Sequence, residues 1–426
     1  MKIEELANKL CVKTKPNIHK LNIYNDIRNC FIKRAHRLDT EKFQSPSINP
    51  TTYIQRNFAQ NEEEFSVYQR ADYIPIKTER KFNRMFRTIN NIKPKTLFFN
   101  SGMASISTIM FYLKNSKGLK TLNLGENVYF ETKWLAEDFT DIKYFNEYNL
   151  NLNIKAQIFW WEYPINCTQP TKFPFEQQLD IEKIFNMIKQ FCDYRPKKNY
   201  FLVIDYTLYY LPFQISDYLL RVPDNLEIFL VTSLQKHRGY GLDLTNGGAV
   251  TFYSKNNKVY EKLVKLRAIM GTSITQETIW TMPEIKIRAI NKLVKDSGEN
   301  AQKIYEFISK YNIEKVKFYF SNNKKFLTSF IFIEIDKELI SRYKKKPYLS
   351  DILIEKIVSS AIKNGAILVY GTSFGLPFTR IFKNSERYDN TNSLRLAVGY
   401  DREMNKNVAK SIIEGVKLFQ KSIRTL

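Results

Sequence analysis

Residues 200–207 read YFLVIDYT and residues 226–236 read LEIFLVTSLQK, so two short apolar runs each lead into polar residues. Short apolar runs rich in Val, Ile and Phe are typical of strands buried on both faces of a parallel sheet. Ligands of such sheets bind at the carboxyl ends of the strands. Asp205 ends the first run and Lys236 follows the second, so both fall where we expect chemistry.

Similar runs occur along the chain and alternate with patterns typical of helices. The strand-like runs are residues 96–99, 121–124, 156–161, 200–204, 226–231 and 249–253, and the helical patterns are residues 102–113, 179–191 and 258–268. Buried runs that alternate with helices predict an α/β fold, in which helices cover both faces of a mostly parallel sheet.

A long helical pattern at residues 284–311 leads into a second, smaller unit. There we expect strands at residues 315–320, 326–335, 366–370 and 393–398, and helices at 350–364 and 405–420. Residues 1–60 are polar and broken by prolines, which predicts a helical arm and an extended linker. The predicted division is an N-terminal arm at 1–66, a large domain at 67–295 and a small α+β domain at 296–426.

The composition excludes several classes of protein. The 426 residues are 43% hydrophobic, enough for a large core, and only 14 Gly and 14 Pro exclude collagen-like and low-complexity chains. Four Cys without a CxxC pair, and three His, argue against a disulfide scaffold and a zinc site, so we expect no metal. Without a signal-peptide pattern or an apolar stretch of 18 residues, we expect a cytoplasmic protein with no membrane partner.

The chain is strongly basic, with 66 Lys plus Arg against 43 Asp plus Glu and a formal net charge of +23. Such an excess is typical of proteins that bind nucleic acid. The lysines are spread along the whole chain, however, which favours a solvated basic surface over a specific groove. We therefore expect no nucleic-acid partner.

Three positions at the ends of predicted strands could carry chemistry. Asn100-Ser101-Gly102-Met103 opens a helix, whose N-terminal N–H groups and dipole suit an anion such as phosphate. Asp205 could bind a cation or a metal, or cap a turn. Lys236 could be an amine nucleophile of lowered pKa or an ordinary solvated lysine. Together, a phosphate site, an acid for a ring cation and an imine-forming lysine are what pyridoxal phosphate requires.

With these residues, the chain resembles the trans-sulfuration family of pyridoxal-phosphate enzymes of cysteine and methionine metabolism. The resemblance covers about residues 66–420 and depends on short motifs in the family's order. These are Tyr68-Gln69-Arg70, Ser101-Gly102-Met103-Ala104, Tyr129, Glu162-Tyr163-Pro164-Ile165-Asn166, Asp205-Tyr206-Thr207, Ser233-Leu234-Gln235-Lys236, Ser373-Phe374-Gly375 and Arg395-Leu396-Ala397-Val398-Gly399.

The resemblance implies a fold and a cofactor. The fold would be that of the fold-type-I pyridoxal-phosphate transferases, as in aspartate aminotransferase, and the cofactor would be pyridoxal 5′-phosphate. The residues that would bind it are Tyr68, Arg70, Ser101, Gly102, Met103, Tyr129, Asn166, Asp205, Thr207, Ser233, Gln235 and Lys236. In the family, Tyr68 and Arg70 would reach across a dimer, which implies a homodimer or homotetramer with shared active sites.

The resemblance also implies catalytic and substrate-binding residues. Lys236 would form the imine and act as the base that removes the α-proton, Asp205 would stabilise the resulting quinonoid, and Tyr129 would stack on the ring and assist as an acid. Arg395 would bind the α-carboxylate of an amino acid, close to Ser373. This predicts a lyase or synthase for a substrate with a β or γ leaving group. The alternatives are an aminotransferase on the same fold, or a basic binding protein on a degenerate scaffold.

Several residues depart from the family's pattern. Gln235 replaces the threonine before the lysine, Phe130 replaces a glycine beside Tyr129, and Cys167 replaces a proline. The histidine of the segment after the lysine is absent from Tyr240-Gly241-Leu242-Asp243. These changes fall mainly around the expected substrate, which indicates a divergent member with an unusual substrate.

Overall fold

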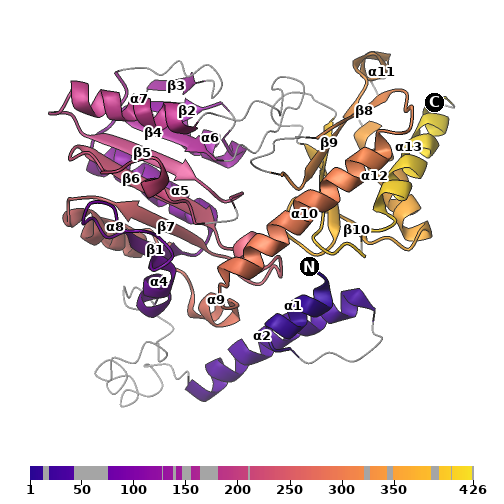
Figure 1. The fold of residues 1–426 in the computed structure, drawn as a ribbon, viewed down its shortest axis with the longest axis horizontal. Helices are drawn as coiled ribbons and strands as arrows, with labels where there is room; N and C mark the ends of the chain where they lie inside the picture. Colours follow the sequence, from indigo (N-terminus) through magenta and orange to yellow (C-terminus); the bar gives the residue numbers. More distant parts are fainter. Residues whose placement is uncertain are drawn as a thin grey trace.

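The computed structural model describes most of the chain (Figure 1). The described ranges are residues 1–12, 19–42, 75–126, 128–137, 141–145, 155–163, 181–209, 212–320, 327–342, 349–384, 393–403 and 405–424. Three of the candidate site residues, Tyr68, Arg70 and Asn166, lie outside these ranges.

A seven-stranded sheet, the large sheet, has the strand order β1-β7-β6-β5-β4-β2-β3. Its strands are β1 (Lys95–Phe99), β2 (Thr121–Gly125), β3 (Asp141–Phe145), β4 (Ile158–Glu162), β5 (Tyr200–Asp205), β6 (Leu226–Ser233) and β7 (Gly248–Tyr253). Strand β7 runs in the opposite direction to the other six strands, so the prediction of a mostly parallel sheet is confirmed. The sequence missed β3 because this edge strand exposes Lys143 and Tyr144 and has no continuous apolar run.

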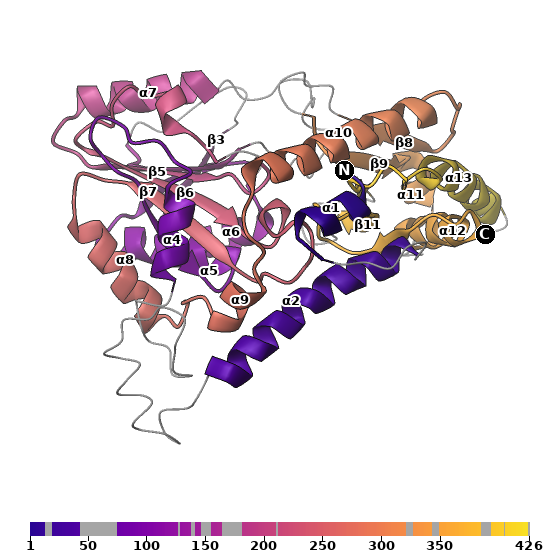
Figure 2. The same ribbon diagram turned by 60° about the horizontal axis from the view of Figure 1, so that its bottom comes forward.

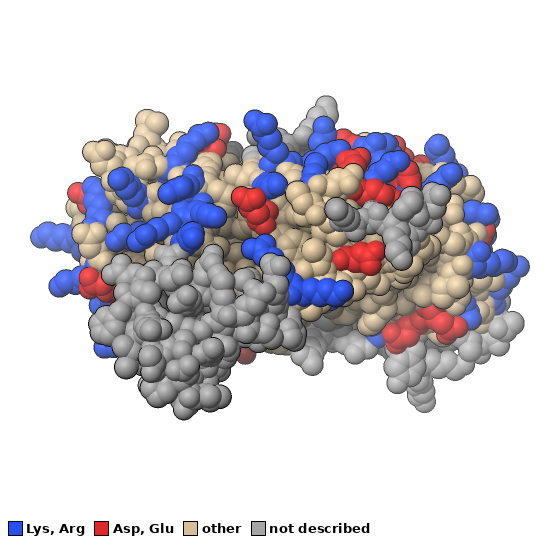
Figure 3. All heavy atoms as spheres, turned by 90° about the horizontal axis from the view of Figure 1, so that it is seen from below, with Lys and Arg blue, Asp and Glu red and all other residues tan. Residues whose placement is uncertain are grey.

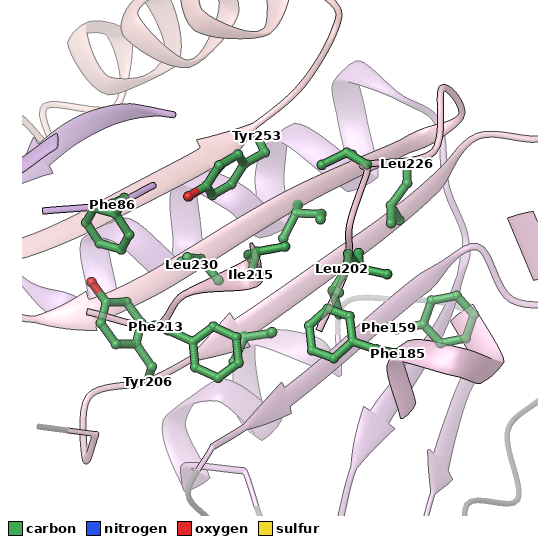
Figure 4. Packing of buried hydrophobic residues seen from close by; sticks show 14 of the residues in the cluster. Phe86, Phe159, Phe185, Leu202, Tyr206, Phe213, Ile215, Leu226, Leu230 and Tyr253 are labelled. Atoms are coloured by element: carbon green, nitrogen blue, oxygen red, sulfur yellow. The ribbon is translucent and has the colours of Figure 1, made fainter. Parts of the chain in front are cut away.

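Helices cover both faces of the large sheet, because alternate residues of each strand point to opposite faces. The covering helices are α4 (Ile76–Asn83), α5 (Gly102–Phe111), α6 (Phe130–Ala136), α7 (Ile181–Tyr194) and α8 (Lys258–Ile269). Leu202 and Ile204 of β5 belong to one core cluster with α7, part of which Figure 4 shows. Phe201 and Val203 belong to a second cluster with α5 and α8 on the other face.

A second, five-stranded sheet, the small sheet, has the order β10-β11-β12-β9-β8. Its strands are β8 (Val316–Tyr319), β9 (Phe330–Ile335), β10 (Leu368–Tyr370), β11 (Thr379–Asn384) and β12 (Ser393–Ala397), and its helices are α11 (Lys337–Arg342), α12 (Leu349–Lys363) and α13 (Val408–Arg424). The long helix α10 (Ile287–Ile308) joins the two sheets, as the sequence predicted (Figure 1). The sequence missed β11, which mixes polar with apolar residues.

The N-terminal helices α1 (Ile3–Lys9) and α2 (Lys20–Lys42) pack against their own chain, below α10 (Figures 1 and 2). The cluster that they form includes Ile3, Leu6, Tyr24 and Ile27 from these helices, Ile290 and Leu293 from α10, and Tyr240, Leu242, Phe378 and Tyr400. The Tyr24 hydroxyl donates a hydrogen bond to the Gly241 carbonyl at 3.1 Å. The α1–α2 pair thus supports the segment that follows Lys236.

A buried ion pair holds the end of β1, from which the turn at Ser101 leaves the sheet. Nη1 of Arg267 lies 2.6 Å from Oε1 of Glu79 and donates a second bond to the Phe98 carbonyl at 3.0 Å. The Phe98 N–H donates to the same Glu79 oxygen at 2.6 Å. Both charged side chains are almost completely buried, so each lowers the cost of burying the other's charge.

We expect the Glu79→Ala substitution to lower the free energy of unfolding by about 3–5 kcal/mol, because it leaves the Arg267 charge buried without its carboxylate. The exposed pair of Arg87 and Asp217 provides the control, since Asp217→Ala should cost about 0–1 kcal/mol. Urea unfolding of the three proteins measures both values. Equal costs for the two substitutions would contradict the role of the buried pair.

Lys and Arg side chains are spread over both halves of the face in Figure 3, with Asp and Glu between them. Among the helices in the described ranges, none is both long and apolar enough to cross a membrane.

Candidate active site

The turn after β1 meets the end of β6 at one edge of the large sheet. A Cβ atom added to Gly102 would lie 3.2 Å from Cβ of Ser233, so the two backbones approach closely. The Ser233 N–H donates a hydrogen bond to Oγ1 of Thr207 at 2.9 Å, which joins the end of β6 to the turn after β5. The structure thus brings together Gly102, Thr207 and Ser233, with Ser101 in the turn before Gly102.

Helix α5 begins at this edge. The hydroxyl of Ser101 caps the helix by accepting the Ala104 N–H at 2.9 Å. The first N–H groups of a helix have no partner within the helix, and here they belong to Gly102 and Met103. With its oxygen engaged as an acceptor, the Ser101 hydroxyl can offer its proton to an anion at the same place.

Asp205 ends β5 and is buried. Its Oδ1 atom accepts two hydrogen bonds from Thr207, one from the N–H at 2.9 Å and one from the hydroxyl at 2.6 Å. Burial raises the pKa of the carboxyl group, and the two hydrogen bonds oppose that rise. Asp205 does cap a turn, and a nearby cation would further stabilise its ionised form.

Lys236 lies between the two sheets. Its Nζ atom is 3.0 Å from Oγ of Ser373 and 5.5 Å from the centre of the Phe374 ring. Burial lowers the pKa of Lys236 to about 8, and the guanidinium groups of Arg395 and Arg380 act in the same direction. Asp243 and Glu131 oppose this shift. The amine is therefore neutral in roughly a tenth of molecules at pH 7, far more than an ordinary lysine.

We expect Lys236 to react with acetic anhydride with a midpoint near pH 8, because only the neutral amine is a nucleophile and its pKa is about 8 rather than 10.5. Reactivity should therefore rise as the pH rises through 8, and well before that of solvent-exposed lysines. Mass spectrometry of the peptides from cofactor-free protein, labelled at a series of pH values, measures this midpoint. A midpoint at pH 10 or above would contradict the burial that the structure shows.

Arg395 comes from β12 of the small sheet. Its Nη2 atom donates to the Thr372 carbonyl at 2.6 Å, and its guanidinium carbon is 4.9 Å from the centre of the Phe330 ring. Burial lowers the pKa of Arg395 to about 10, while Tyr129 and Glu162 favour its charged form. Nε is buried without a hydrogen-bond partner among the described residues. The Arg395 guanidinium thus keeps an unused N–H donor, at Nε, for an incoming anion.

Tyr129 precedes α6, and its ring contacts that of Phe130 with 4.6 Å between the ring centres. Burial and the neighbouring Glu131 carboxylate raise the pKa of Tyr129 well above its ordinary value. The phenol is therefore protonated at neutral pH and can donate a proton, but it cannot act as a base. The sequence did not single out Glu131, and nothing in its local pattern marks it.

Two residues beside the lysine have other partners. The Nε2 atom of Gln235 donates to Oδ1 of Asp243 at 2.9 Å, so its amide is already engaged, although it was predicted to bind the cofactor. The backbone N–H of Gln235 lies 3.4 Å from the Ser233 hydroxyl. His237 opens the short helix η3 (His237–Gly239), and burial lowers its pKa to about 3. Its ring packs against Phe374 rather than serving as a charged group.

The candidate site thus consists of residues from both sheets. At one edge of the large sheet lie Ser101, Gly102, Met103, Asp205, Thr207, Ser233 and Lys236. Ser373, in the segment after β10, contacts Lys236, and Arg395 of β12 contacts the residue before Ser373. Within the described ranges, no group of three or more His, Cys, Asp or Glu is arranged to hold a metal ion. Tyr68, Arg70 and Asn166 lie outside the described residues, so their predicted roles stay predictions.

Solved structures of cystathionine gamma synthase from Xanthomonas oryzae pv. oryzae are similar in fold to this chain. The complex with aminoacrylate and cysteine has a TM-score of 0.54 at 14% sequence identity, and the match covers 77% of this chain and 82% of that one. The complex with cystathionine has a TM-score of 0.52 at 14% identity, covering 78% and 82%. No family model and no curated protein matches the sequence. The likeness confirms the predicted fold class, and at this identity it shows the fold alone.

Proposed function

We propose that the protein is a pyridoxal-phosphate-dependent lyase or synthase that acts on an amino acid with a β or γ leaving group. The observation that carries the proposal is the position of Lys236. Its amine has a pKa of about 8, contacts Ser373, and lies at a site edge that also contains Asp205 and a helix N-terminus. The trans-sulfuration motifs and the shared fold support the same reading.

The residues present fit the cofactor in three respects. The start of α5, closely packed against Ser233, offers N–H groups of Gly102 and Met103 to a phosphate. The buried Asp205 carboxylate, whose hydrogen bonds come from Thr207 alone in the described part of the chain, suits a protonated ring nitrogen. Lys236 suits the aldehyde.

The same fit assigns the residues that would hold the cofactor. Thr207 and Ser233 would hold the phosphate of the cofactor, and Tyr129 would cover its ring. When bound, the cofactor supplies an electron sink for a carbanion at the substrate α-carbon.

Arg395 would bind the amino acid and orient it. A guanidinium suits a carboxylate because it can donate two parallel hydrogen bonds. Its Nη2 atom is fixed by the Thr372 carbonyl, so its position relative to the neighbouring Ser373 and Lys236 is defined before substrate arrives. Arg395 would then set which bond to the α-carbon faces the Lys236 amine.

Lys236 would act as the base that takes the α-proton of the amino acid. A base works best when its pKa is near the working pH, and a value of about 8 meets that condition. The hydroxyl of Ser373 holds Nζ in place while it takes the α-proton. Tyr129, whose phenol stays protonated, would donate to the leaving group. Two different groups thus supply the base and the acid.

We also propose a homodimer or homotetramer in which Tyr68 and Arg70 complete a neighbouring site. This proposal depends on the resemblance to the family. Mixing Lys236→Ala with Arg70→Ala protein after partial unfolding and refolding would restore activity if active sites are shared between subunits, and would not restore it if each chain carries a complete site.

The experiment that tests the proposed function is α-proton exchange in deuterated water. Protein loaded with pyridoxal phosphate should exchange the α-proton of at least one amino acid that carries a β or γ leaving group, and should release that group. Conversion of the cofactor to its pyridoxamine form, without release, would instead indicate an aminotransferase. No exchange with any such amino acid would refute the proposal.

A further inference from the structure

We propose that Tyr24 of α2 is a positioning residue for Lys236, and that the α1–α2 pair is a brace that holds the lysine against the segment carrying Ser373. Two segments meet there: the lysine loop, residues 236–242, and the facing segment, residues 371–378, between β10 and β11. The inference rests on the proposed function only for what Lys236 does in the reaction. The brace itself consists of contacts within the chain, so it can be tested without catalysis.

The lysine loop and the facing segment touch through their backbones. Gly241 has a positive φ of 65°, and a Cβ atom added to it would overlap the carbonyl oxygen of Gly375. Gly375 has a φ of 80°, and a Cβ atom added there would lie 2.8 Å from Nδ1 of His237. Glycine adopts this conformation readily and permits such a close approach. Because Ser373 of the facing segment lies 3.0 Å from Nζ of Lys236, this backbone contact sets where the amine and the hydroxyl meet.

The backbone of Gly241 links Tyr24 to Lys236. The Gly241 N–H donates a hydrogen bond to the Lys236 carbonyl at 3.2 Å, and the Gly241 carbonyl accepts the Tyr24 hydroxyl at 3.1 Å. Burial raises the pKa of Tyr24, so its hydroxyl stays protonated and remains a donor. The ring of Tyr24 packs edge-to-face on Phe378 of the facing segment, with 5.3 Å between the ring centres. Tyr24 thus contacts both of the segments that position the lysine.

A buried carboxylate anchors both N-terminal helices to the same place. The Oδ2 atom of Asp401 accepts the Ile3 N–H at 2.8 Å, and its Oδ1 atom lies 3.2 Å from Nζ of Lys20. The Asp401 N–H donates to the Pro377 carbonyl at 3.1 Å, so the anchor leads back to the facing segment. Helices α1 and α2 are therefore fixed to the segment that also contacts the lysine.

The lysine loop is also tied to the helix that joins the two sheets. The Tyr240 hydroxyl donates to the Glu284 carbonyl and accepts the Lys286 N–H, each at 2.8 Å. Lys286 is the N-cap residue of α10. Ile290 and Leu293 of α10 belong to one core cluster with residues of α1 and α2, which lie below α10 in Figure 2. The brace thus covers the joint between the two sheets at the place where the lysine loop meets it.

The brace opposes the movement that a charged Lys236 would favour. Burial lowers the pKa of Lys236 to about 8, so its protonated form is less stable in the closed loop than in water. A protonated amine would therefore gain free energy by leaving Ser373 for solvent, and the contacts of the closed loop resist that movement. The charged groups that face the amine, none of which a Tyr24 substitution removes, are Asp243, Arg395, Arg380 and Glu131. A weaker brace should thus raise the pKa of Lys236 toward its ordinary value.

The test compares Tyr24→Phe with Tyr253→Phe in cofactor-free protein. Each substitution removes one tyrosine hydroxyl that donates to a backbone carbonyl, and that of Tyr253, at the end of β7, donates to Arg87 at 2.9 Å, outside the lysine loop. Labelling with acetic anhydride over a series of pH values measures the midpoint of Lys236. Tyr24→Phe should raise this midpoint by about half to one pH unit, the equivalent of one hydrogen bond. Tyr253→Phe should leave it at the wild-type value.

Two outcomes would overturn the brace: a folded Tyr24→Phe protein with the wild-type midpoint, or a Tyr253→Phe protein whose midpoint rises equally, which would indicate a general loss of stability. If Tyr24→Phe does not fold, Lys20→Gln decides, because it removes the ion pair with Asp401 at the start of α2. Lys20→Gln should raise the midpoint by about a quarter to half a pH unit, and an unchanged midpoint would overturn the proposal.

The brace and the proposed function can fail separately. A midpoint raised by Tyr24→Phe, in a protein that exchanges no α-proton after loading with pyridoxal phosphate, would refute the proposed function and leave the brace standing. Exchange by the loaded wild type, with no change of midpoint in Tyr24→Phe, would refute the brace alone.

Discussion

Replacing Lys236 by alanine should reduce α-proton exchange by about 10⁴-fold or more, because removal of the base alone is worth about 10²–10⁴-fold. The loss should be larger than that of the base alone, since the same amine would also hold the cofactor. The measurement is the exchange rate in deuterated water with a fixed, saturating amino acid.

The matched control is Lys258→Ala, which removes an exposed lysine at the start of α8. It should leave the exchange rate unchanged. A Lys236→Ala protein that exchanges at the wild-type rate would mean that another group takes the α-proton and that the site is misassigned.

Replacing Asp205 by asparagine should lower kcat by about 10²–10³-fold, the usual cost of removing one preorganised electrostatic group. Asparagine keeps the shape of the side chain, and its amide oxygen can still accept the bonds from Thr207. The negative charge is lost, and with it the partner for a protonated ring nitrogen. Steady-state kinetics at saturating substrate measure the effect.

The same substitution should not destabilise the cofactor-free protein. Burial raises the pKa of Asp205, which means that the fold disfavours its charge, so a neutral amide should give an equal or higher thermal midpoint. This readout separates a functional loss from a structural one. A fall in kcat that is matched by a large drop in thermal midpoint would show that Asp205 serves the fold rather than the reaction.

The residues at the strand ends could be predicted from the sequence because burial on both faces produces continuous apolar runs. Asp205 and Lys236 each follow such a run, and a mostly parallel sheet brings the ends of its strands to one edge. Arg395 was different: only the motif resemblance singled it out. Its approach to the lysine depends on how the two sheets meet, which no local pattern records.

Other features were hidden from the sequence for physical reasons. Strand β11 lacks a regular apolar pattern because each of its faces mixes polar and apolar residues, with Ile381 and Lys383 on one face and Arg380 and Phe382 on the other. The packing of α1 and α2 against the chain depends on contacts with residues hundreds of positions away, such as that of Tyr24 with Gly241. The engagement of Gln235 by Asp243 depends on a left-handed backbone conformation at Asp243, which the sequence does not signal.

The central claim is that Lys236 bonds covalently to pyridoxal phosphate. The most direct test is to add the cofactor, reduce the protein with borohydride, and locate the modified peptide by mass spectrometry. We expect a yellow protein that is bleached by borohydride and carries a pyridoxyl group on Lys236. A colourless protein, or a pyridoxyl group on another lysine with Lys236 unmodified, would contradict it.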